Sequence, residues 1–547
     1  MKYILVCGGV ISGVGKGVIS SSIGHMLKNE GHHVTIVKID PYLNFNAGTL
    51  GPRDHGEVFV LDDGTETDLD LGNYERFLGS NLTKFNSITS GRMYSEVIKR
   101  EREGEYLGKT VQVVPHVTDH IKNSIRNAAF LPVENHTTPP NICIIELGGV
   151  VGDIESITFI EALRQMHVEE GREKFLVVGV DYSLEINGEH KTKPIQASAK
   201  RARELGIPYD MVVCRSKSKI EKDPMDKIIL FTGAEKVVEM PNCNVLDVPA
   251  QLAGDTGVLE YLNRRLNLPI IENVQKDDAH LLKIVAAKAN TCKVAIVGKY
   301  SNHEDAYLSI KESLKIAGAA DEIDADVKTT YFDTSSFKGA QSLEILKAFD
   351  GIVIPGGFGR RGVEEMILVA EYARNNQIPL LGICLGMQII AIEYARNILN
   401  IQNATSEELV TEEDIHTIID DKINDENCPS DKSAYSLIIS KHPGKIRIGR
   451  HETATISGTR TAELYGSIEG SIISERFRHR YGVNTKYVSE FEKNGLKVGA
   501  RHKNYIDALE MPEHPFYMGV QFHPEFLSKP GMPRPCFTAF LLACLRK

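Results

Sequence analysis

The sequence predicts an α/β protein with two large units, each built around a parallel β-sheet. Short apolar runs alternate with helix-length amphipathic stretches along the chain, which is the pattern of strands joined by crossover helices. Two of these runs, Tyr3–Cys7 and Val294–Val297, are each followed directly by glycine. Each of them opens a new series of alternating elements. A chain of 547 residues is also longer than one hydrophobic core usually supports.

Buried strands are expected where the apolar runs are continuous, because a strand covered on both faces needs no polar alternation. Besides the two opening strands, the candidates are Val34–Val37, Ile142–Ile145, Phe175–Val180, Met211–Cys214, Ile352–Ile354 and Leu380–Ile383. Between the halves, Asn267–Asn290 begins with a proline-containing segment and becomes an amphipathic helix. We therefore expect a first domain over residues 1–270, a linker over 271–292 and a second domain over 293–547. The polar stretch Thr411–Ser433 is expected to be a surface excursion.

The composition argues against several classes of protein. Lys plus Arg is 63 and Asp plus Glu is 73, and the net charge of −10 argues against sequence-independent binding of nucleic acid. No apolar stretch reaches the ~18–20 residues that a membrane span needs, so no membrane partner is expected. The nine cysteines are odd in number and none has zinc-site spacing, which favours a reducing, cytoplasmic location over a disulfide framework.

A glycine-rich segment with one lysine follows the first predicted strand. Gly8–Gly17 leads into a helix-like stretch, Val18–Asn29, so backbone N–H groups and the helix N-terminus favour phosphate, and Lys16 adds a positive charge. The strict Walker pattern fails, because Val10 stands where glycine is required and Gly17 stands where the serine or threonine ligand of magnesium is required. The alternative is a strand-to-helix turn that binds nothing.

Carboxylates are the natural substitute for the missing hydroxyl, because magnesium is a hard ion that prefers oxygen ligands. The acidic loop Thr67–Gly72 contains Asp70, and Glu146 ends the apolar run Ile142–Ile145, at the strand end where ligands bind in open parallel sheets. Taken alone, each of these acids is more often a solvated surface residue. Together with the glycine-rich segment, they predict a magnesium–nucleotide site.

Two further segments of the first half suit polar ligands. Gly148–Ser156 combines glycine-rich backbone with acids, which allows close approach of a base or sugar. Lys191–Gln196 places two lysines beside a predicted helix start, as a second triphosphate requires. The alternative for the second segment is an exposed basic turn.

In the second half, Leu381–Gln388 has the pattern of a nucleophile elbow. A predicted strand runs into a tight turn at Cys384, and a helix begins directly after it. Gly382 and Gly386 remove side chains where the strand and the helix must pass close together. The helix N-terminus favours the thiolate, the form that attacks an amide, although a lone cysteine in an apolar stretch is usually inert core.

Amide hydrolysis also needs a general base and an oxyanion hole. His523 followed by Glu525 supplies a base and an orienting carboxylate, and in an extended segment the two side chains would lie on one face. Pro355–Gly359 follows a predicted strand and offers free backbone N–H groups, and the N–H of Leu385 is the second expected donor. The second half therefore predicts a cysteine hydrolase.

These residues carry a family resemblance along nearly the whole chain. The second half, through Pro355–Gly359, Gly382–Gln388 and His523–Glu525, resembles a class I (triad) glutamine amidotransferase domain. The first half resembles the synthase domain of the CTP synthases, on the motifs Gly8–Ser12, Gly15–Gly17, Lys38–Tyr42, His55–Val60, Thr67–Phe77, Gly152–Ser156 and Lys191–Gln196. The resemblance implies a P-loop-like (dethiobiotin-synthetase-like) parallel-sheet synthase domain followed by a flavodoxin-like amidotransferase domain.

The family makes CTP from UTP, ATP and glutamine, so the resemblance implies a ligase of pyrimidine nucleotide biosynthesis. ATP phosphorylates O4 of uracil, and ammonia released from glutamine displaces that phosphate. Family members use Mg²⁺, are activated by GTP and inhibited by CTP, and form homotetramers that often stack into filaments. The implied partners are therefore the small-molecule substrates and further copies of the chain.

The resemblance also implies roles for residues at matching positions. ATP and its phosphates are expected at Ser12, Gly13, Val14, Gly15, Lys16, Gly17, Val18, Lys38 and Asp70, and magnesium is expected at Asp70 and Glu146. UTP and the inhibitor CTP are expected at Ser12, Asp153, Ile154, Glu155, Lys191, Thr192, Lys193, Pro194, Ile195, Gln196 and Lys227. Glutamine is expected at Gly357, Leu385, Gly386, Met387, Gln388, Glu408 and Arg480. Cys384, His523 and Glu525 would form the catalytic triad, and His55 would lie along the ammonia route.

The chain departs from the family pattern at three places and leaves two alternatives open. Cys7 and Ile195 stand where the family usually has threonine, and Pro443–Gly449 replaces a Gly-Gly-Thr-Met-Arg-Leu-Gly stretch. One alternative is another ATP-dependent amidotransferase ligase, of the cobyric acid synthase type, although Lys191–Gln196 and His55–Val60 favour the CTP synthases. The other is a catalytically idle, filament-forming relative, which would be expected to have lost its nucleophile or its phosphate-loop residues.

Overall fold

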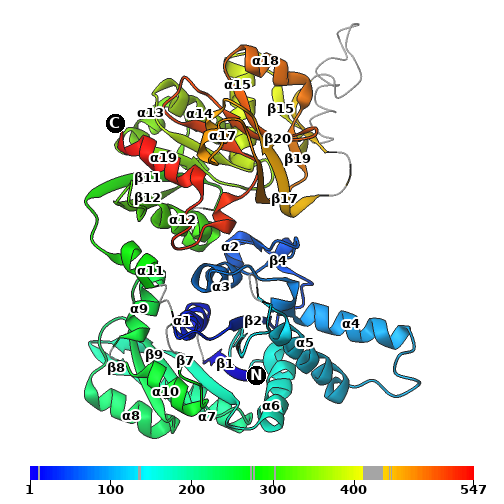
Figure 1. Ribbon diagram of the computed structural model, residues 1–547, viewed down its shortest axis with the longest axis vertical. Coiled ribbons are helices and arrows are strands. Elements are labelled where there is room, and N and C mark those ends of the chain that lie inside the picture. Colours follow the sequence, from blue (N-terminus) through cyan, green and yellow to red (C-terminus); the bar gives the residue numbers. More distant parts are fainter. Residues whose placement is uncertain are drawn as a thin grey trace. The chain divides into compact units, whose positions relative to one another are not determined.

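The computed structural model describes residues 1–9, 13–133, 137–254, 256–271, 274, 278–300, 303–410, 435–442, 444 and 446–546. The chain divides into two compact units (Figure 1): the first contains Met1–Thr49 and Thr65–Ala286, and the second contains Leu50–Gly64 and Ala287–Lys547. These units differ from the expected boundaries in two respects. Residues 50–64 group with the second unit, and the helix that was expected in the linker groups with the first. Local periodicity predicts that an element exists, but it does not reveal which core the element packs against.

A sheet of eight strands forms the centre of the first unit, in the order β10-β9-β7-β1-β6-β2-β5, with β8 paired to β7. The strands are β1 (Lys2–Gly8), β2 (Val34–Asp40), β5 (Ser87–Thr89), β6 (Ile142–Leu147), β7 (Phe175–Ile186), β8 (Glu189–Lys191), β9 (Met211–Ser216) and β10 (Lys236–Pro241); a short strand, β4 (Glu66–Thr67), lies outside this sheet. All pairs along the ordered path are parallel. Leu5 of β1 lies opposite Ile145 and Val177, so the loop after β1 leaves the middle of the sheet at its carboxyl edge.

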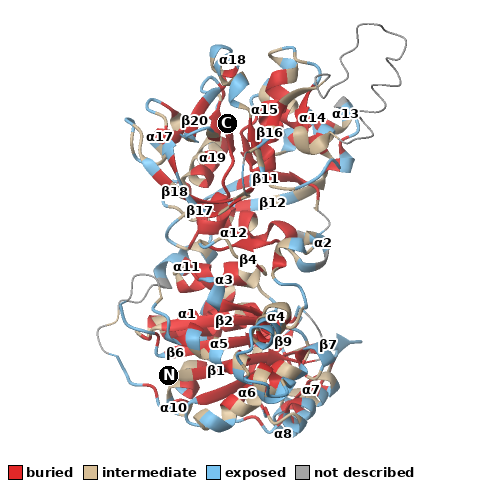
Figure 2. Cartoon of the chain, turned by 90° about the vertical axis from the view of Figure 1, so that its right-hand side faces the viewer, coloured by how far each residue is buried: buried red, intermediate tan, exposed pale blue. Residues whose placement is uncertain are grey.

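Helices cover both faces of this sheet. They are α1 (Lys16–Asn29), α3 (Asp70–Leu78), α4 (Ser90–Arg102), α5 (Thr118–Phe130), α6 (Ile157–Glu170), α7 (Lys193–Glu204), α8 (Lys222–Thr232), α9 (Val248–Ala253), α10 (Val258–Arg265) and α11 (Asp278–Val285). Tyr3, Leu5 and Cys7 point to one face and share a hydrophobic core with α4, α5, α6 and α7, whereas α1 packs against β1, β2 and β6 from the other. Figure 2 shows these strands buried between the helices.

A mixed sheet of nine strands forms the centre of the second unit, in the order β12-β11-β13-β14-β22-β21-β20-β17-β18. The strands are β11 (Asn290–Gly298), β12 (Ala325–Asp333), β13 (Gly351–Ile354), β14 (Leu380–Ile383), β17 (Arg447–Thr455), β18 (Ile472–His479), β20 (Lys497–His502), β21 (Tyr505–Glu510) and β22 (Tyr517–Val520). Pairing is parallel from β12 to β22 and antiparallel from β22 to β18. A smaller sheet contains β15 (Ala404–Ser406), β16 (Ser436–Lys441) and β19 (Tyr481–Val483), and residues 50–64 add β3 (Phe59–Val60).

Two pairs of long helices enclose the parallel half of this sheet. One core cluster packs α14 (Val363–Asn375) and α15 (Leu385–Asn397) on one face, and another packs α12 (Leu308–Gly318) and α19 (Pro535–Leu545) on the other. The shorter helices of the unit are α2 (Pro52–His55), α13 (Ala340–Leu343), α17 (Arg460–Leu464) and α18 (Val488–Lys493). Cys384 lies between β14 and α15, at the carboxyl edge of the sheet.

Each strand predicted from a continuous apolar run is present in the structure, and the helix expected over Val18–Asn29 lies within α1. The antiparallel strands of the second unit were not predicted. The polar stretch Thr411–Ser433, and Pro443 and Lys445 of the departing segment, lie outside the described residues. Within the part of the chain that is described, no helix is long and apolar enough to cross a membrane.

Candidate active sites

The glycine-rich loop of the first unit joins β1 to α1. Gly15 has a φ of 88°, a left-handed backbone that favours glycine, and Lys16 is the first residue of the helix. The Lys16 side chain is buried and its Nζ donates to the carbonyl of Gly149 at 2.8 Å. Burial lowers the pKa of Lys16, and the charge of Glu146 opposes this shift. Ser12 lies outside the described residues, so its predicted nucleotide contacts are not placed.

The missing Walker hydroxyl has a structural counterpart at Gly17. A Cβ atom at this position would collide with Oδ1 of Asp70, the first residue of α3. The Asp70 carboxylate therefore fills the space that a serine or threonine side chain would take in a standard phosphate loop. This is the placement that a substitute magnesium ligand requires.

Four carboxylates surround the ammonium group of Lys38 near this loop. Lys38 Nζ forms an ion pair with Asp70 and lies 3.2 Å from Glu146, 3.5 Å from Asp40 and 3.7 Å from Asp68. The structure thus brings together Lys38, Asp70 and Glu146, which the sequence predicted. The structure adds Asp40 and Asp68 to this group. In the sequence, each of them lies two residues from a predicted site residue, Asp40 from Lys38 and Asp68 from Asp70.

The carboxylates of this cluster outnumber the cations beside them. Burial, reinforced by the neighbouring carboxylates, raises the pKa of Asp40 to about 8, of Glu146 to about 7 and of Asp68 to about 6. The pKa of Asp70 is lowered instead, because its ion pair with Lys38 outweighs the effect of burial. The cluster therefore carries more carboxylate than Lys38 and Lys16 neutralise.

This donor set fits a hard divalent cation. The donors are carboxylate oxygens, and Oδ2 of Asp40 is buried and accepts no hydrogen bond from the described residues. Asp70 and Glu146 are the two carboxylates nearest to Lys38 Nζ. Within the described ranges, no group of three or more His, Cys, Asp or Glu side chains is already arranged as a metal site, and the Lys38 ammonium lies among the carboxylates.

Arg215 is a cation of this site that the sequence did not reveal. It is the second-to-last residue of β9, at the carboxyl end of the strand, and a Cβ on Gly15 would lie 2.7 Å from its Nη1. Its Nη2 donates to Asn242 Oδ1 at 3.1 Å, while its Nε is buried without a hydrogen-bond partner among the described residues. No glycine pattern or charge run marks this arginine in the sequence, because only the parallel sheet brings it to the loop.

Three predicted nucleotide-binding lysines lie around the start of α7. Lys193 is the first residue of α7, is exposed, and its Nζ lies 5.8 Å from the centre of the Phe231 ring. Lys191 ends β8 and forms an ion pair with Glu189. The pKa of Glu189 is lowered, first by Lys191 and also by the charge of Lys227 on α8, so these two lysines share one neighbourhood.

The remaining residues of the predicted UTP site divide between surface and core. Gly152 packs against Arg201 of α7, which brings the loop of Asp153, Ile154 and Glu155 to this helix, and the Ile154 side chain is exposed. Thr192 precedes α7, and Pro194, Ile195 and Gln196 lie in its first turn. The Ile195 side chain, however, is fully buried in the hydrophobic core, so only its backbone is available to a nucleotide.

In the second unit, the predicted nucleophile elbow is a strained turn. Cys384 has a φ of 53°, which is rare for a residue other than glycine, and its N–H donates to the carbonyl of Val520 at 2.7 Å. A Cβ on Gly386 would collide with the carbonyl of Ile354, and a Cβ on Gly382 would lie 2.6 Å from the Gly386 backbone. Gly382 therefore allows the close passage of β14 and α15 that the sequence predicted, and Gly386 allows α15 to approach β13.

His523 and Glu525 are paired beside this turn. Nδ1 of His523 lies 2.7 Å from Oε1 of Glu525, and both residues are buried. Burial alone would lower the pKa of His523, but the charges of Glu525 and Cys384 outweigh it and raise this pKa to about 10. The segment is not extended, because Pro524–Leu527 forms a 3₁₀ turn. The expected local geometry is therefore wrong, while the expected pairing is present.

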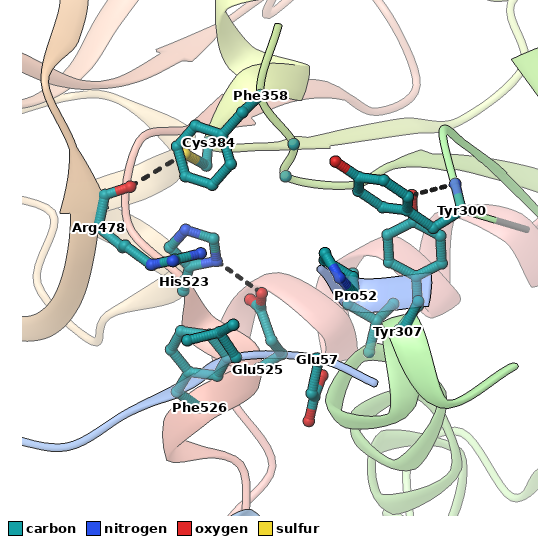
Figure 3. A pocket seen from close by; sticks show the side chains of 15 residues that line it. Pro52, Glu57, Tyr300, Tyr307, Phe358, Cys384, Arg478, His523, Glu525 and Phe526 are labelled. Carbon is teal, nitrogen blue, oxygen red and sulfur yellow. Dashed lines mark hydrogen bonds and ion pairs between the residues drawn. The ribbon is translucent and has the colours of Figure 1, made fainter. Parts of the chain in front are cut away.

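A pocket of about 70 Å³ opens over Cys384 (Figure 3). Gly356, Gly357 and Phe358 form one side of it, and a Cβ on Gly356 would lie 3.0 Å from Cε1 of His523. The Cys384 thiol donates to the carbonyl of Arg478 at 3.7 Å. The glycine-rich loop after β13 thus lies directly against Cys384 and His523, where the predicted hydrolase would need an oxyanion hole.

The predicted glutamine-binding residues differ in how they approach this pocket. Leu385, Gly386, Met387 and Gln388 form the first turn of α15, and the Met387 side chain is buried in the core. Gln388 Nε2 donates to the carbonyl of Tyr481 at 3.1 Å. Glu408 Oε1 accepts from the N–H of Gly359 at 3.0 Å, and Arg480 is exposed after β18, outside the residues that line the pocket.

Part of the pocket wall comes from residues 50–64. Pro52, Glu57 and Val58 line the pocket together with the predicted triad, and the Glu57 carboxylate is visible below Glu525 in Figure 3. Glu57 Oε2 accepts from the backbone N–H of Ser309 at 2.9 Å, and Oε1 accepts from its hydroxyl, at the start of α12. His55, predicted along the ammonia route, is exposed and is not among the residues that line this pocket.

A second anchor holds the other end of this segment. Asp62 accepts from Arg476 Nε at 2.6 Å and lies 3.0 Å from Arg450 Nη1. Between the anchors, the ring of Phe59 packs edge-on against Phe526 with 5.0 Å between centres. Residues 50–64 are therefore an integral part of the second unit's candidate active site, which their sequence position did not indicate.

Known proteins resemble the chain over both units. A family model described as "CTP synthase N-terminus" matches residues 2–268, and one described as "Glutamine amidotransferase class-I" matches residues 303–543. A CTP synthase of Methanococcoides burtonii is 43% identical over 100% of this chain and 99% of its own. A CTP synthase of Eremothecium gossypii is 41% identical over 99% of this chain and 96% of its own.

Among solved structures, the glutaminase domain of Trypanosoma brucei CTPS, with bound acivicin, has 30% sequence identity and a TM-score of 0.40, covering 47% of this chain and 94% of that chain. These two CTP synthases cover nearly the whole chain, so they carry both of its halves in one protein. The chain therefore belongs to the CTP synthase family.

Proposed function

We propose that the chain converts UTP to CTP through two reactions, one in each unit. In the second unit, the Cys384 thiolate attacks the side-chain carbonyl carbon of glutamine, the C–N bond breaks, and His523 gives a proton to the departing ammonia. Water then hydrolyses the thioester to glutamate. In the first unit, O4 of uracil takes the γ-phosphoryl group of ATP and ADP leaves; ammonia then bonds to C4 and phosphate departs.

The observation that carries this proposal is that each unit places a set of reactive groups at the carboxyl edge of its own parallel strands. In one unit Lys16 opens a helix after a glycine-rich loop with Asp70 against it, and in the other Cys384 opens a helix beside the His523–Glu525 pair. A binding protein would need neither a strained thiol nor a paired imidazole.

The direct test follows the absorbance of CTP with UTP, ATP, magnesium and glutamine present, and then with each one omitted. Product is expected only when UTP, ATP and magnesium are present together with either glutamine or ammonia. CTP formation without ATP, or none with the complete mixture, would contradict the proposal.

Magnesium is proposed as the metal at Asp70 and Glu146, which have the carboxylate oxygen donors that suit it. When bound, it supplies charge neutralisation at the transferred phosphoryl group. Lys16 and Lys38 would hold the phosphate oxygens in place, and Arg215 beside Gly15 is a further cation within reach of the same loop.

A shared phosphate cradle for UTP and the inhibitor CTP is proposed at Lys191, Lys193 and Lys227. Both nucleotides carry the same triphosphate, so Lys193→Ala is expected to weaken both together. The loss of one charge-assisted contact costs about 1.5–3 kcal/mol, which is roughly a tenfold to hundredfold effect. The measurement is the KM for UTP and the inhibition constant for CTP in the same preparation.

Lys200→Ala is the matched control, because Lys200 is also exposed on α7 but pairs with Glu204 at 3.8 Å. It is expected to leave both constants unchanged. If CTP inhibited Lys193→Ala as strongly as wild type while UTP binding collapsed, the shared cradle would be wrong.

Residues 50–64 are proposed to confine ammonia at its source, because Glu57 and Val58 wall the pocket over Cys384. Glu57→Gln keeps the shape of the side chain but replaces the carboxylate, whose two oxygens accept hydrogen bonds from Ser309, with a neutral amide. Glutamine hydrolysis is expected to continue, while the CTP formed per glutamine hydrolysed falls several-fold. Parallel assays of glutamate and CTP measure this ratio.

The control is Asp63→Asn, an exposed acid of the same segment, which is expected to keep the wild-type ratio. A Glu57→Gln protein that still couples every hydrolysis to CTP would show that the anchor has no role in confining ammonia.

The family resemblance further supports GTP activation, CTP feedback inhibition, a homotetramer with the capacity to form filaments, and a cytoplasmic location. His55 remains the residue proposed for the ammonia route beyond the pocket.

A further inference from the structure

One buried lysine near the thiol has no role in the reactions above. Lys299 follows β11 directly, and its side chain is 1% exposed. Lysine is rarely buried so completely, because an ammonium group loses its hydration unless strong acceptors replace it. The contacts of Lys299 therefore indicate what its charge is for.

The acceptors of Lys299 are backbone carbonyls of the loop that lies against Cys384. Its Nζ donates to the carbonyl of Phe358 at 3.0 Å and also to that of Gly359. β11 and β13 are neighbouring parallel strands, so the residue after one lies beside the loop after the other.

The Phe358–Gly359 peptide is held on both of its sides. Its oxygen accepts from the ammonium of Lys299 at 3.0 Å, and its N–H donates to Oε1 of Glu408 at 3.0 Å. A cation at the oxygen and a carboxylate at the N–H fix the direction of the peptide dipole, because turning the peptide over would place like partial charges against both groups.

The loop needs such a restraint. Gly356, Gly357 and Gly359 offer no side chains to pack, and Gly359 has a φ of 77°. The stem of Lys299 runs along the loop, since a Cβ on Gly357 would lie 3.5 Å from its Cδ. Oxyanion stabilisation depends on donors that are already oriented, so a freely turning loop would lose most of its effect.

We propose that Lys299 is a positioning residue for glutamine hydrolysis, which fixes the Phe358–Gly359 peptide and thereby keeps the N–H groups of Gly356 and Gly357 aimed at the oxyanion formed at Cys384. The inference rests on the proposed hydrolysis of glutamine at Cys384. Burial lowers the pKa of Lys299 to about 8, an effect that the charge of Glu408 opposes, so the side chain is mainly an ammonium at neutral pH.

Lys299→Met tests this role, because it keeps the length of the side chain and removes the donors. The glutaminase kcat is expected to fall about 10- to 100-fold with KM changed less than about threefold, somewhat less than the loss of a direct oxyanion donor. Ammonia-dependent CTP synthesis and the rate of Cys384 alkylation by iodoacetamide are expected to remain at wild-type levels.

A second readout isolates the oxyanion. The aldehyde analogue of glutamine, glutamate γ-semialdehyde, adds the Cys384 sulfur to its carbonyl carbon and forms a tetrahedral adduct with an oxygen in the oxyanion position. Its inhibition constant is expected to rise in Lys299→Met about as much as kcat falls, because both depend on the same donors. Lys299→Arg, which retains charge and donors, is expected to recover part of both losses.

Lys293→Met is the matched control, an exposed lysine on β11, the strand that Lys299 follows, and it is expected to behave as wild type. If Lys299→Met does not fold, Lys299→Gln undergoes the same measurements.

Unchanged kcat, or equal loss of the glutamine- and ammonia-dependent reactions in a folded variant, would overturn the proposal. If Cys384→Ala still hydrolysed glutamine, the proposed function itself would fail, whereas an inactive Cys384→Ala beside a fully active Lys299→Met would refute only the role of Lys299.

Discussion

Cys384→Ala is expected to abolish CTP formation from glutamine while leaving CTP formation from ammonia largely intact. The thiol is proposed as the nucleophile only for glutamine, and the groups proposed to bind phosphate lie in the other unit. Removal of the nucleophile from a catalytic triad lowers kcat by as much as about 10⁶-fold, so a loss of at least about 10⁴-fold is expected here. The two rates are measured from CTP absorbance at saturating UTP and ATP.

A second cysteine provides the control for this experiment. Cys544 is in the same unit, on α19, and its side chain is buried in the hydrophobic core. Cys544→Ala should therefore retain both activities with only a modest loss of stability. The division of labour between the units would be untenable if Cys384→Ala lost both activities equally while it remained folded. Thermal unfolding of the variant shows whether it is folded.

The fold was predictable where the physical cause is local. Strand segments buried on both faces, such as Ile142–Ile145 and Phe175–Val180, appear in the sequence as continuous apolar runs, and the glycines of the elbow mark the close approach of a strand and a helix. The antiparallel strands of the second unit could not be predicted in this way. Arg447–Thr455 is largely polar and exposed on one face, and nothing in its sequence indicates which neighbour it pairs with.

The candidate sites were predictable at residues that belong to a motif and not at residues that only the fold brings there. The failed Walker pattern at Gly17 predicted a carboxylate, and Asp70 lies against that glycine. Arg215, Glu57 and Lys299 carry no motif of their own. Each reaches its site because a strand end or a loop packs there, which depends on contacts between residues far apart in sequence.

The pair His523 and Glu525 shows a third case, in which the right contact was expected for an incorrect local reason. An extended segment would place the two side chains on one face, but proline at position 524 starts a 3₁₀ turn. The turn still brings the carboxylate to 2.7 Å from the imidazole. Spacing therefore predicted the chemistry more reliably than the backbone conformation.

Asp70→Asn is expected to reduce CTP synthesis by about 10²-fold or more with either nitrogen source, because several kcal/mol of charge stabilisation at the phosphoryl group depend on the metal ligand. Basal glutamine hydrolysis, which is proposed to use Cys384 in the other unit, should survive. Wild-type protein should also unfold at a higher temperature when magnesium is added, since a ligand of the folded state stabilises it, and Asp70→Asn should lose this shift.

Asp119→Asn, a change at an exposed acid paired with Lys122 on α5, is the control and should keep both the activity and the shift. Wild-type synthesis by Asp70→Asn, or an unchanged magnesium-dependent shift, would exclude Asp70 as a metal ligand and leave its contact with Gly17 as a packing feature of the loop.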